Sequence, residues 1–416
     1  MSVITIVVTC VLAVVFLASF VVWSIKRHRD PHLRVQTDAP IETLIPSIAG
    51  LSLGTIVEGN SVELLENAAF FEVLIADIRS AKVSIHFETF LWSDGTLGRR
   101  LAAALSERAR AGVQVRILLD AIGSKKVGSE TEEQMKEAGC KVEWFHRRHI
   151  WNIGVLAERD HRKLVIIDGR IGFAGGHCIV DDWVNGKALD LSVKIRGPVV
   201  HTLQSVFSEN WTGHTAELFL GDSFFPTLQP EGTVAAHVAY AKPEGSAPAV
   251  KILHHLVIGL AQKRLWIQNA YFIPEPAAIN AFGDAVKRGV DVRVMTPSMT
   301  GSDNPMVQHA AHRNFEKLLK CGVRIYEYPK GLLHQKVMTI DGIWSAVGSS
   351  NFDDRSFETN DEITIGFKDK ALAQQLESIF ERYIPECKEV DLEEWRKRGL
   401  WLRAKEQAYY LINEVL

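Results

Sequence analysis

Hydrophobic and polar positions along the chain predict two similar series of strands and helices. Runs rich in β-branched and aromatic residues predict strands at 81–92, 113–120 and 141–145, and again at 263–274, 290–297 and 323–328. Helical spacing of apolar residues predicts helices at 97–112 and up to about Gly139, and again at 279–289 and 315–322. The order recurs at an offset of about 173 to 183 residues, which indicates a two-fold internal repeat.

This alternation predicts an α/β fold of two pseudo-two-fold related units, each a β-sheet flanked by helices. A chain of 416 residues is long enough for two domains with separate cores. The predicted parts are an N-terminal transmembrane anchor (1–29), a connector (30–61), a first α/β domain (62–220), a second connector (221–249), a second α/β domain (250–390) and a C-terminal helical tail (391–416).

The segment from Val3 to Ile25 contains no charged residue. As a helix it would extend roughly 34 Å, which is enough for a bilayer core of about 30 Å. Lys26, Arg27 and Arg29 follow it at once, so the positive-inside tendency predicts a single-pass protein of the cell membrane with its body in the cytoplasm. The alternative, a cleaved signal peptide, would carry its positive charge before the apolar run.

The tail mixes apolar and basic residues. Trp395, Leu400, Trp401 and Leu402 stand among five arginines and lysines. Such a mixture suits a membrane interface, and it also suits a helix packed on the protein body. The sequence leaves both interpretations open.

The overall composition argues against several classes of function. The formal net charge is -3, whereas nucleic-acid binders usually carry a basic excess, so no nucleic-acid partner is predicted. The five cysteines show no paired spacing, which argues against a disulfide framework or a zinc site. No cofactor and no metal is predicted.

Two short strands carry the same chemical pattern. HRKLVIID begins at His161 and HQKVMTID at His334, and in each a lysine follows the histidine by two residues. Residues i and i+2 of a strand face the same side, so His161 projects with Lys163 and His334 with Lys336. Lysine suits a phosphate oxygen, and histidine serves as nucleophile or general acid and base. Two such pairs brought together could hold one phosphodiester from both sides.

Each pattern continues to an aspartate, Asp168 or Asp341, and then to a turn of small residues that includes Gly176 or Ser349. The turns allow close approach of the backbone and supply N–H donors. The candidate catalytic residues are His161, Lys163, Asp168, His334, Lys336 and Asp341. The place of the two aspartates at the ends of their strands favours a role in fixing the turn.

A catalytic histidine needs an acceptor on its other ring nitrogen. Asp190 follows His161 by 29 residues, and Glu362 follows His334 by 28. We therefore expect each acid to orient the histidine of its own half. A metal site is disfavoured because the neighbours of the histidines are lysines and no cluster has ligand spacing.

The doubled HxKx4D(x6)G[GS] pattern resembles the phospholipase D superfamily, and within it the bacterial cardiolipin synthases. The segments NAYFIP, GVRIYEYPKGLLHQK and VGSSNFDDRSFETNDE, which begin at Asn269, Gly322 and Val347, strengthen the resemblance. It implies one active site between two α/β units, without a metal. Lys163 and Lys336 would hold the phosphate, assisted by Asn351 and the small-residue turns. Cys178 departs from the family pattern, which has asparagine there.

The resemblance implies a membrane-bound phosphatidyltransferase. It would make cardiolipin from two phosphatidylglycerol molecules, donor and acceptor, through a phosphatidyl-histidine, and it would release glycerol. Which histidine is the nucleophile stays open. A phospholipase D hydrolase that releases phosphatidic acid, a non-catalytic membrane scaffold of the same fold and, least favoured, a nuclease are the alternatives. The expected partners are membrane phospholipids and the lipid bilayer.

Overall fold

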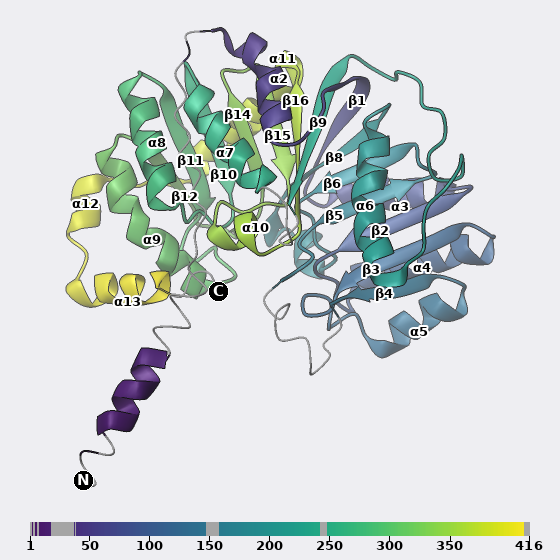
Figure 1. Ribbon diagram of the computed structural model, residues 1–416, viewed down its shortest axis with the longest axis horizontal. Helices are drawn as coiled ribbons and strands as arrows, with labels where there is room; N and C mark the ends of the chain where they lie inside the picture. The colour runs from purple at the N-terminus through teal and green to yellow at the C-terminus, as the bar shows by residue number, and fades with distance from the viewer. Residues whose placement is uncertain are drawn as a thin grey trace. The chain divides into compact units, whose positions relative to one another are not determined.

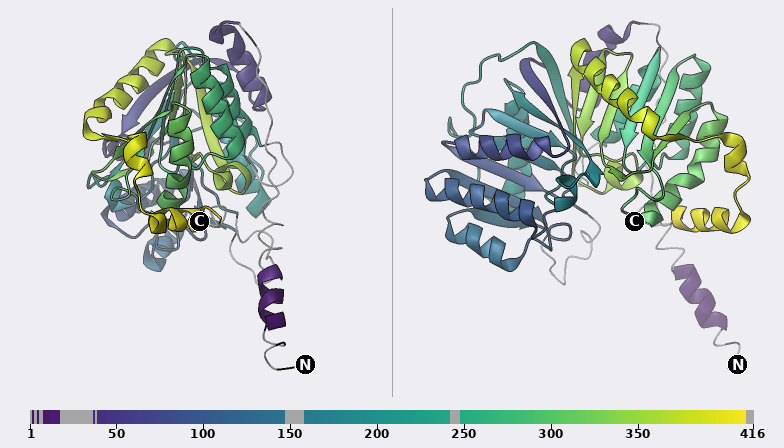
Figure 2. Two further views of the ribbon diagram at one scale, coloured as in Figure 1. Left: turned by 90° about the vertical axis from the view of Figure 1, so that its left-hand side faces the viewer. Right: turned by 180° about the vertical axis from the view of Figure 1, so that it is seen from behind.

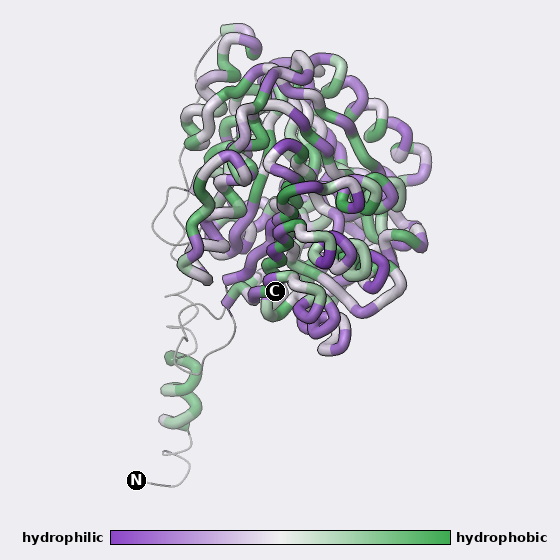
Figure 3. The backbone as a smooth tube through the Cα atoms, turned by 90° about the vertical axis from the view of Figure 1, so that its right-hand side faces the viewer, coloured by the Kyte–Doolittle hydropathy of each residue, from purple (hydrophilic) through white to green (hydrophobic). Residues whose placement is uncertain are grey.

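The computed structural model describes residues 2, 5, 8–17, 37, 39–146, 158–241 and 248–411. The chain divides into two compact units, 1–32 and 33–416. In the first unit, residues 8–17 are helical and mostly hydrophobic (Figure 3). Most of the predicted membrane span falls outside the described residues, and among those described no helix is long and apolar enough to cross a membrane.

In the second unit, the first half of the chain alternates strands and helices. Its elements are α2 (Ile41–Leu51), β1 (Val57–Glu66), α3 (Ala69–Ser80), β2 (Ser84–Thr89), α4 (Thr96–Arg110), β3 (Gln114–Asp120), α5 (Ser129–Glu137), β4 (Lys141–Phe145), β5 (Lys163–Ile167), β6 (Ile171–Gly175), the 3₁₀ helix η2 (Asp181–Trp183), β7 (Ala188–Leu189), β8 (Leu191–Arg196) and α6 (Val200–Thr215).

The second half repeats this alternation. Its elements are β9 (Val234–Ala241), α7 (Ala249–Leu260), β10 (Arg264–Asn269), α8 (Pro276–Lys287), β11 (Asp291–Pro297), α9 (Pro305–Lys320), β12 (Arg324–Tyr328), β13 (Leu332–Leu333), β14 (Lys336–Ile340), β15 (Trp344–Gly348), α10 (Asp354–Glu358), β16 (Glu362–Lys368), α11 (Lys370–Tyr383), η3 (Ile384–Glu386), β17 (Lys388–Glu389), α12 (Leu392–Arg396) and α13 (Leu400–Tyr410). Helix α9 begins ten residues before the predicted helix at 315–322.

The strand order confirms the internal repeat. The described residues form a 15-stranded sheet in the order β17-β12-β11-β10-β14-β15-β16-β9-β1-β8-β6-β5-β2-β3-β4. The antiparallel pair of β9 and β1 lies at the centre. Outward from it, β16, β15, β14, β10, β11 and β12 on one side correspond to β8, β6, β5, β2, β3 and β4 on the other, and β17 is an addition to the first side. On each side three parallel strands, β2 to β4 or β10 to β12, continue into an antiparallel series.

Helices cover both faces of the sheet, as predicted for an α/β fold (Figures 1 and 2). Helices α3, α4 and α5 cover one face of the first half and α6 the other, while α7, α8 and α9 cover one face of the second half and α11 the other. Strands buried on both sides read as continuous apolar runs, as β5 does. Ile166 and Val193 of the first half share a core with Val337 and Ile365 of the second, so the halves are packed together.

The segments expected to be connectors and tail are more structured than their sequences indicated. The segment 30–61 contains α2, which buries Ile41, Ile45 and Ile48 because they lie on one face of the helix. The segment 221–249 contains β9, which joins the two halves of the sheet. In the tail Trp395 is buried, but Leu400 is exposed to solvent.

Candidate active site

Two short pairings between the halves bring the histidines of both patterns to one place. The strand β7 pairs in parallel with β13, so that the backbone N–H of His334 donates to the carbonyl of Leu189 at 2.7 Å. An isolated parallel bridge joins Asp160 to Asp361, and the N–H of His161 donates to the Asp361 carbonyl at 3.0 Å. Both histidine side chains are buried.

These pairings give each histidine a carboxylate from the opposite half. The Nδ1 atom of His161 lies 2.8 Å from Oε1 of Glu362, and Nδ1 of His334 lies 2.7 Å from Oδ2 of Asp190. The expectation that each acid orients the histidine of its own half is therefore wrong. The reason is that a parallel bridge sets the next residues of two chains side by side: His334 and Asp190 follow one pairing, and His161 and Glu362 follow the other.

Both carboxylates are themselves held in place. Asp190 accepts hydrogen bonds from its neighbour's backbone N–H and from Nε1 of Trp183, each at 2.8 Å. Glu362 accepts a hydrogen bond from the hydroxyl of Ser349. Gly176 lies so close to Asp190 that a Cβ there would stand 2.2 Å from Oδ1. The two small-residue turns thus support the acids.

The electrostatic surroundings of the two pairs differ. Burial lowers the pKa of His161 well below its usual value, and the nearby lysines lower it further. Burial also lowers the pKa of His334, and Lys336 lowers it further, but Asp190 opposes this. Burial alone would raise the pKa of Asp190, yet His334 and His177 hold it at about 2, whereas burial raises the pKa of Glu362. The carboxyl group of Asp190 therefore has a lower pKa than that of Glu362 and stays ionised to lower pH.

Each lysine is anchored to the histidine of its own pattern. Lys163 Nζ donates to the carbonyl oxygen of His161 at 2.6 Å, and Lys336 Nζ to that of His334 at 2.7 Å. An ammonium has three donors, so this bond leaves others for a phosphate. Burial lowers the pKa of Lys336 to about 8.

The turns differ between the halves at the position that departs from the family pattern. Asn351 is buried, and within the described part of the chain its Oδ1 atom has no hydrogen-bond partner. The corresponding Cys178 donates to the carbonyl of Gly176 at 3.7 Å, and burial raises the pKa of its thiol to about 11. The Asn351 Oδ1 atom is therefore free to bind a substrate, whereas Cys178 presents a protonated thiol at the corresponding position.

The two aspartates of the patterns lie apart from this cluster. They follow β5 and β14, seven residues and roughly 20 Å beyond the histidines. Both have positive φ, 54° for Asp168 and 57° for Asp341. Their carboxylates accept hydrogen bonds from three successive backbone N–H groups each, those of residues 82–84 and 262–264. They fix turns, as their places at the strand ends favoured.

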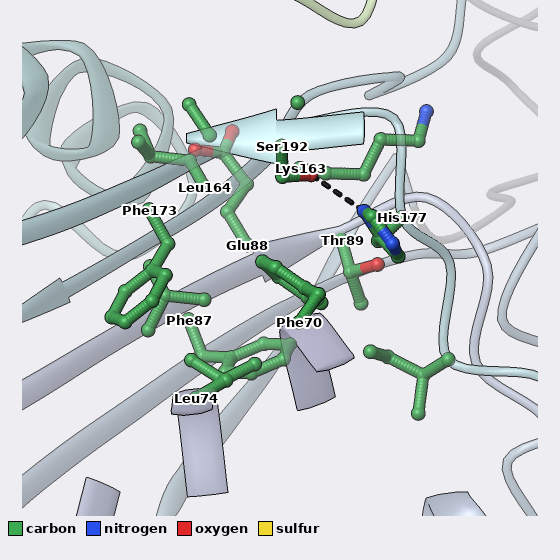
Figure 4. Close-up of a pocket in the computed structure, with 14 residues that line it drawn as sticks. Phe70, Leu74, Phe87, Glu88, Thr89, Lys163, Leu164, Phe173, His177 and Ser192 are labelled. Atoms are coloured by element: carbon green, nitrogen blue, oxygen red, sulfur yellow. Dashed lines mark hydrogen bonds between the residues drawn. The ribbon is translucent and has the colours of Figure 1, made fainter. Parts of the chain in front are cut away.

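Aromatic residues that the sequence did not single out also contact the site. The ring of Trp183 meets His334 edge to face at 5.2 Å, and that of Phe90 meets His161 at 4.9 Å. His177 stacks on Phe70 at 4.2 Å and shares a hydrogen bond with Ser192 beside Lys163 (Figure 4). No spacing rule points to them: Trp183 reaches His334 across the two halves, and Phe90 contacts the histidine of its own half.

The pocket of Figure 4 does not hold a lipid. Its volume is about 10 Å³, the lower limit for a single water molecule.

Among the residues that the structure describes, no group of three or more His, Cys, Asp or Glu could hold a metal ion. The two imidazoles and two ammonium groups together can bind a phosphodiester, attack it and protonate a leaving oxygen.

Comparison with known proteins gives a consistent result. The family described as "Cardiolipin synthase, PLD-like domain" matches residues 74–211 and 256–384. The chain is 32% identical over 368 residues to the major cardiolipin synthase ClsA of Bacillus subtilis, covering 86% of this chain and 76% of that protein. It is 35% identical over 344 residues to cardiolipin synthase A of Pseudomonas putida, covering 81% of this chain and 71% of that protein.

Solved structures share the fold. A phosphatidylserine synthase of Haemophilus influenzae superposes with a TM-score of 0.64 over 85% of this chain and 95% of its own, at 13% identity. A polyphosphate kinase of Porphyromonas gingivalis superposes with a TM-score of 0.54 over 93% of this chain and 58% of its own, at 11% identity. At such identities the likeness concerns the fold alone.

Proposed function

The chain belongs to the family of phospholipase D-like cardiolipin synthases, and on that premise we propose that it is a phosphatidyltransferase that makes cardiolipin from two phosphatidylglycerol molecules. The observation that carries the proposal is the crossed pair of histidine–carboxylate contacts in one buried cluster. Neither half has a complete set of catalytic groups without the other, so the active site is shared by both halves.

In the first step, Nε2 of one histidine attacks the phosphorus of the donor lipid. The bond from phosphorus to the glycerol oxygen breaks, and the other histidine gives its Nε2 proton to that oxygen. Lys163, Lys336 and Asn351 hold the phosphate and stabilise the charge that develops on its oxygens. Glycerol leaves, and a phosphatidyl-histidine remains.

In the second step, the histidine that gave up its proton acts as base. It removes the hydroxyl proton of a second phosphatidylglycerol, whose oxygen attacks phosphorus as the phosphorus–nitrogen bond breaks. The product is cardiolipin, and both imidazoles return to their first state. Water in place of the lipid alcohol would give phosphatidic acid, so exclusion of water decides between transferase and hydrolase.

The difference between the two pairs supports an assignment of roles. A nucleophile must be neutral, and the pKa of His161 lies well below its usual value because of burial and the nearby lysines. A general acid must hold a proton, and the Asp190 carboxylate, whose pKa is about 2, opposes the lowering of the His334 pKa by burial and Lys336. We assign His161 as the nucleophile and His334 as the general acid and base.

The uncharged segment from Val3 to Ile25 anchors the protein in the cell membrane in this proposal, with the catalytic body on the cytoplasmic side. Its length and the basic residues that follow support this. The anchor keeps the active site close to both lipid substrates, which raises their effective concentration.

The test is to supply the purified protein with phosphatidylglycerol labelled in its glycerol headgroup. We expect labelled glycerol and cardiolipin in equal amounts, with little phosphatidic acid. Phosphatidic acid as the main lipid product would establish a hydrolase instead. The absence of both glycerol release and a diphosphatidyl product would refute both activities.

A further inference from the structure

Helix α13 turns an apolar stripe away from the protein. Leu400 is 84% exposed, Trp401 83% and Leu411 53%, and Ala404 and Ala408 are also exposed. At about 100° per residue these five side chains fall on one side of the helix. A surface helix normally buries such a stripe against its own protein, so this face is available to a partner.

The opposite side of α13 is fixed to the body by polar and aromatic contacts. The contacts are a 3.0 Å hydrogen bond from Arg403 to Glu316, an ion pair of buried Glu406 with Arg398, a stack of Tyr409 on His309 and a cation–π contact of Arg313 with Tyr410. These contacts hold the helix in one orientation, and in that orientation the apolar stripe faces solvent.

The charges around the stripe are positive. The acidic side chains within α12 and α13 are occupied: Glu393 pairs with Arg396, Glu394 with Lys388 and Glu406 with Arg398. Lys397 and Lys405 are exposed, and neither has a carboxylate within 4.0 Å among the residues that the structure describes. Tryptophan and leucine beside lysines that have no carboxylate partner are typical of a helix that lies in the interface of an anionic membrane.

The stripe also lies at the end of the body that carries the active site. In Figure 1 α13 runs along the lower edge of the body, and its last turn adjoins the start of α9. Helix α9 begins just after the carboxyl end of β11, and the register of Asn269 with Lys336 puts His334 at the carboxyl end of the neighbouring β10.

We propose that this face of α13 docks on the surface of an anionic lipid bilayer. Leu400 and Trp401 would enter the interface, and Lys397 and Lys405 would meet the phosphate headgroups. A second copy of the chain fits less well, because five side chains, two of them alanines, fall short of the roughly 800 Å² per partner of a stable interface. This contact is additional to the proposed N-terminal anchor. Only its role, which is to turn the active-site end toward the lipids, rests on the proposed function.

The binding test uses the full chain in proteoliposomes. Cys10, Cys321 and Cys387 are first replaced by serine, and Ala408→Cys is then labelled with an environment-sensitive dye. The matched control is Ala371→Cys, an alanine that is also exposed, at the start of α11. In vesicles of phosphatidylglycerol and phosphatidylcholine we expect a blue-shifted emission and quenching by nitroxide lipid for the dye at 408 only, and a weaker effect in pure phosphatidylcholine. Adding His161→Ala should leave this signal unchanged, so its outcome is independent of the proposed catalysis.

Function is tested with Leu400→Glu/Trp401→Glu against Leu51→Glu/Leu53→Glu, a pair of exposed leucines at the end of α2. The first pair should remove the dye shift and raise the KM for vesicle lipid at least roughly tenfold with little change in kcat, since it removes the burial of two large side chains, each of which is worth about tenfold or more. The second pair should do neither. An unshifted dye at 408, an equal shift at 371, or efficient cross-linking of Ala408→Cys dimers in detergent would overturn the proposal, the last by identifying a second copy as the partner.

Discussion

The Oδ2 atom of Asp190 lies 2.7 Å from Nδ1 of His334, although 144 residues separate the two and they belong to different halves of the repeat. Glu362 and His161 form the reciprocal contact at 2.8 Å across 201 residues. Each half thus supplies one histidine and the acid that orients the other half's histidine. The two catalytic histidines consequently depend on different acids.

This crossing predicts which step each acid supports. A phosphatidyl ester of p-nitrophenol reports the first step alone, because its leaving group departs without protonation. Glu362→Gln should slow the p-nitrophenol burst roughly 10²–10⁴-fold, since it misorients the nucleophile His161. Asp190→Asn should leave the burst near normal and slow transfer to the acceptor. Pairing within each half would give the reverse result.

Gly176 should tolerate no side chain. A Cβ there would stand 2.2 Å from Asp190 Oδ1, so Gly176→Ala should displace the acid from His334 and lower kcat roughly 10²-fold. Combined with Asp190→Asn, it should add little, because both remove the same contact. Gly213→Ala is the control, since no atom lies within 4 Å of a Cβ there. Equal, independent effects of Gly176→Ala and Asp190→Asn would contradict this account.

Asp341 should prove to be a stabilising residue. Asp341→Ala removes the acceptor of three backbone N–H groups and should lower the free energy of unfolding by roughly 2–4 kcal/mol. Asp341→Asn keeps an acceptor and tolerates the positive φ, so its loss should be smaller. Denaturant titration in detergent measures both. The kcat per folded molecule should stay near that of the wild type, and a loss of several orders of magnitude would instead place Asp341 in catalysis.

The rate should fall as the pH rises through about 8. Lys336 is charged below that value and neutral above it, because burial lowers its pKa to about 8, and only the ammonium attracts the phosphate. The pH profile of kcat/KM measures this alkaline limb. Lys336→Arg should shift the limb to higher pH, since a guanidinium stays charged, even if the rate itself is lower. A limb that does not move in this variant would assign it to another group.

The sequence predicted much of the fold because the repeat is local. Buried strands such as β5 and β14 are mostly apolar, and each lysine lies beside its histidine through strand geometry alone. The turn-fixing role of Asp168 was also readable, from its place at a strand end.

The pairing of the acids was not readable. A separation of 29 residues along the chain does not reveal that β7 will pair with β13, or Asp160 with Asp361. These pairings form only when the two halves pack together. Trp183 was missed for the same reason, because it contacts a histidine of the other half. The helix α2 and the strand β9 were not predicted because their apolar residues are buried only when the complete sheet has formed.

The most direct test of the shared site and its assigned roles is to trap the covalent intermediate. With the phosphatidyl p-nitrophenol ester, His334→Ala should release one equivalent of p-nitrophenol and then stall, because the base for the acceptor is missing. Peptide mass spectrometry should then find a phosphatidyl group on His161. His161→Ala should give neither burst nor adduct. An adduct on His334, or none in either variant, would contradict the account.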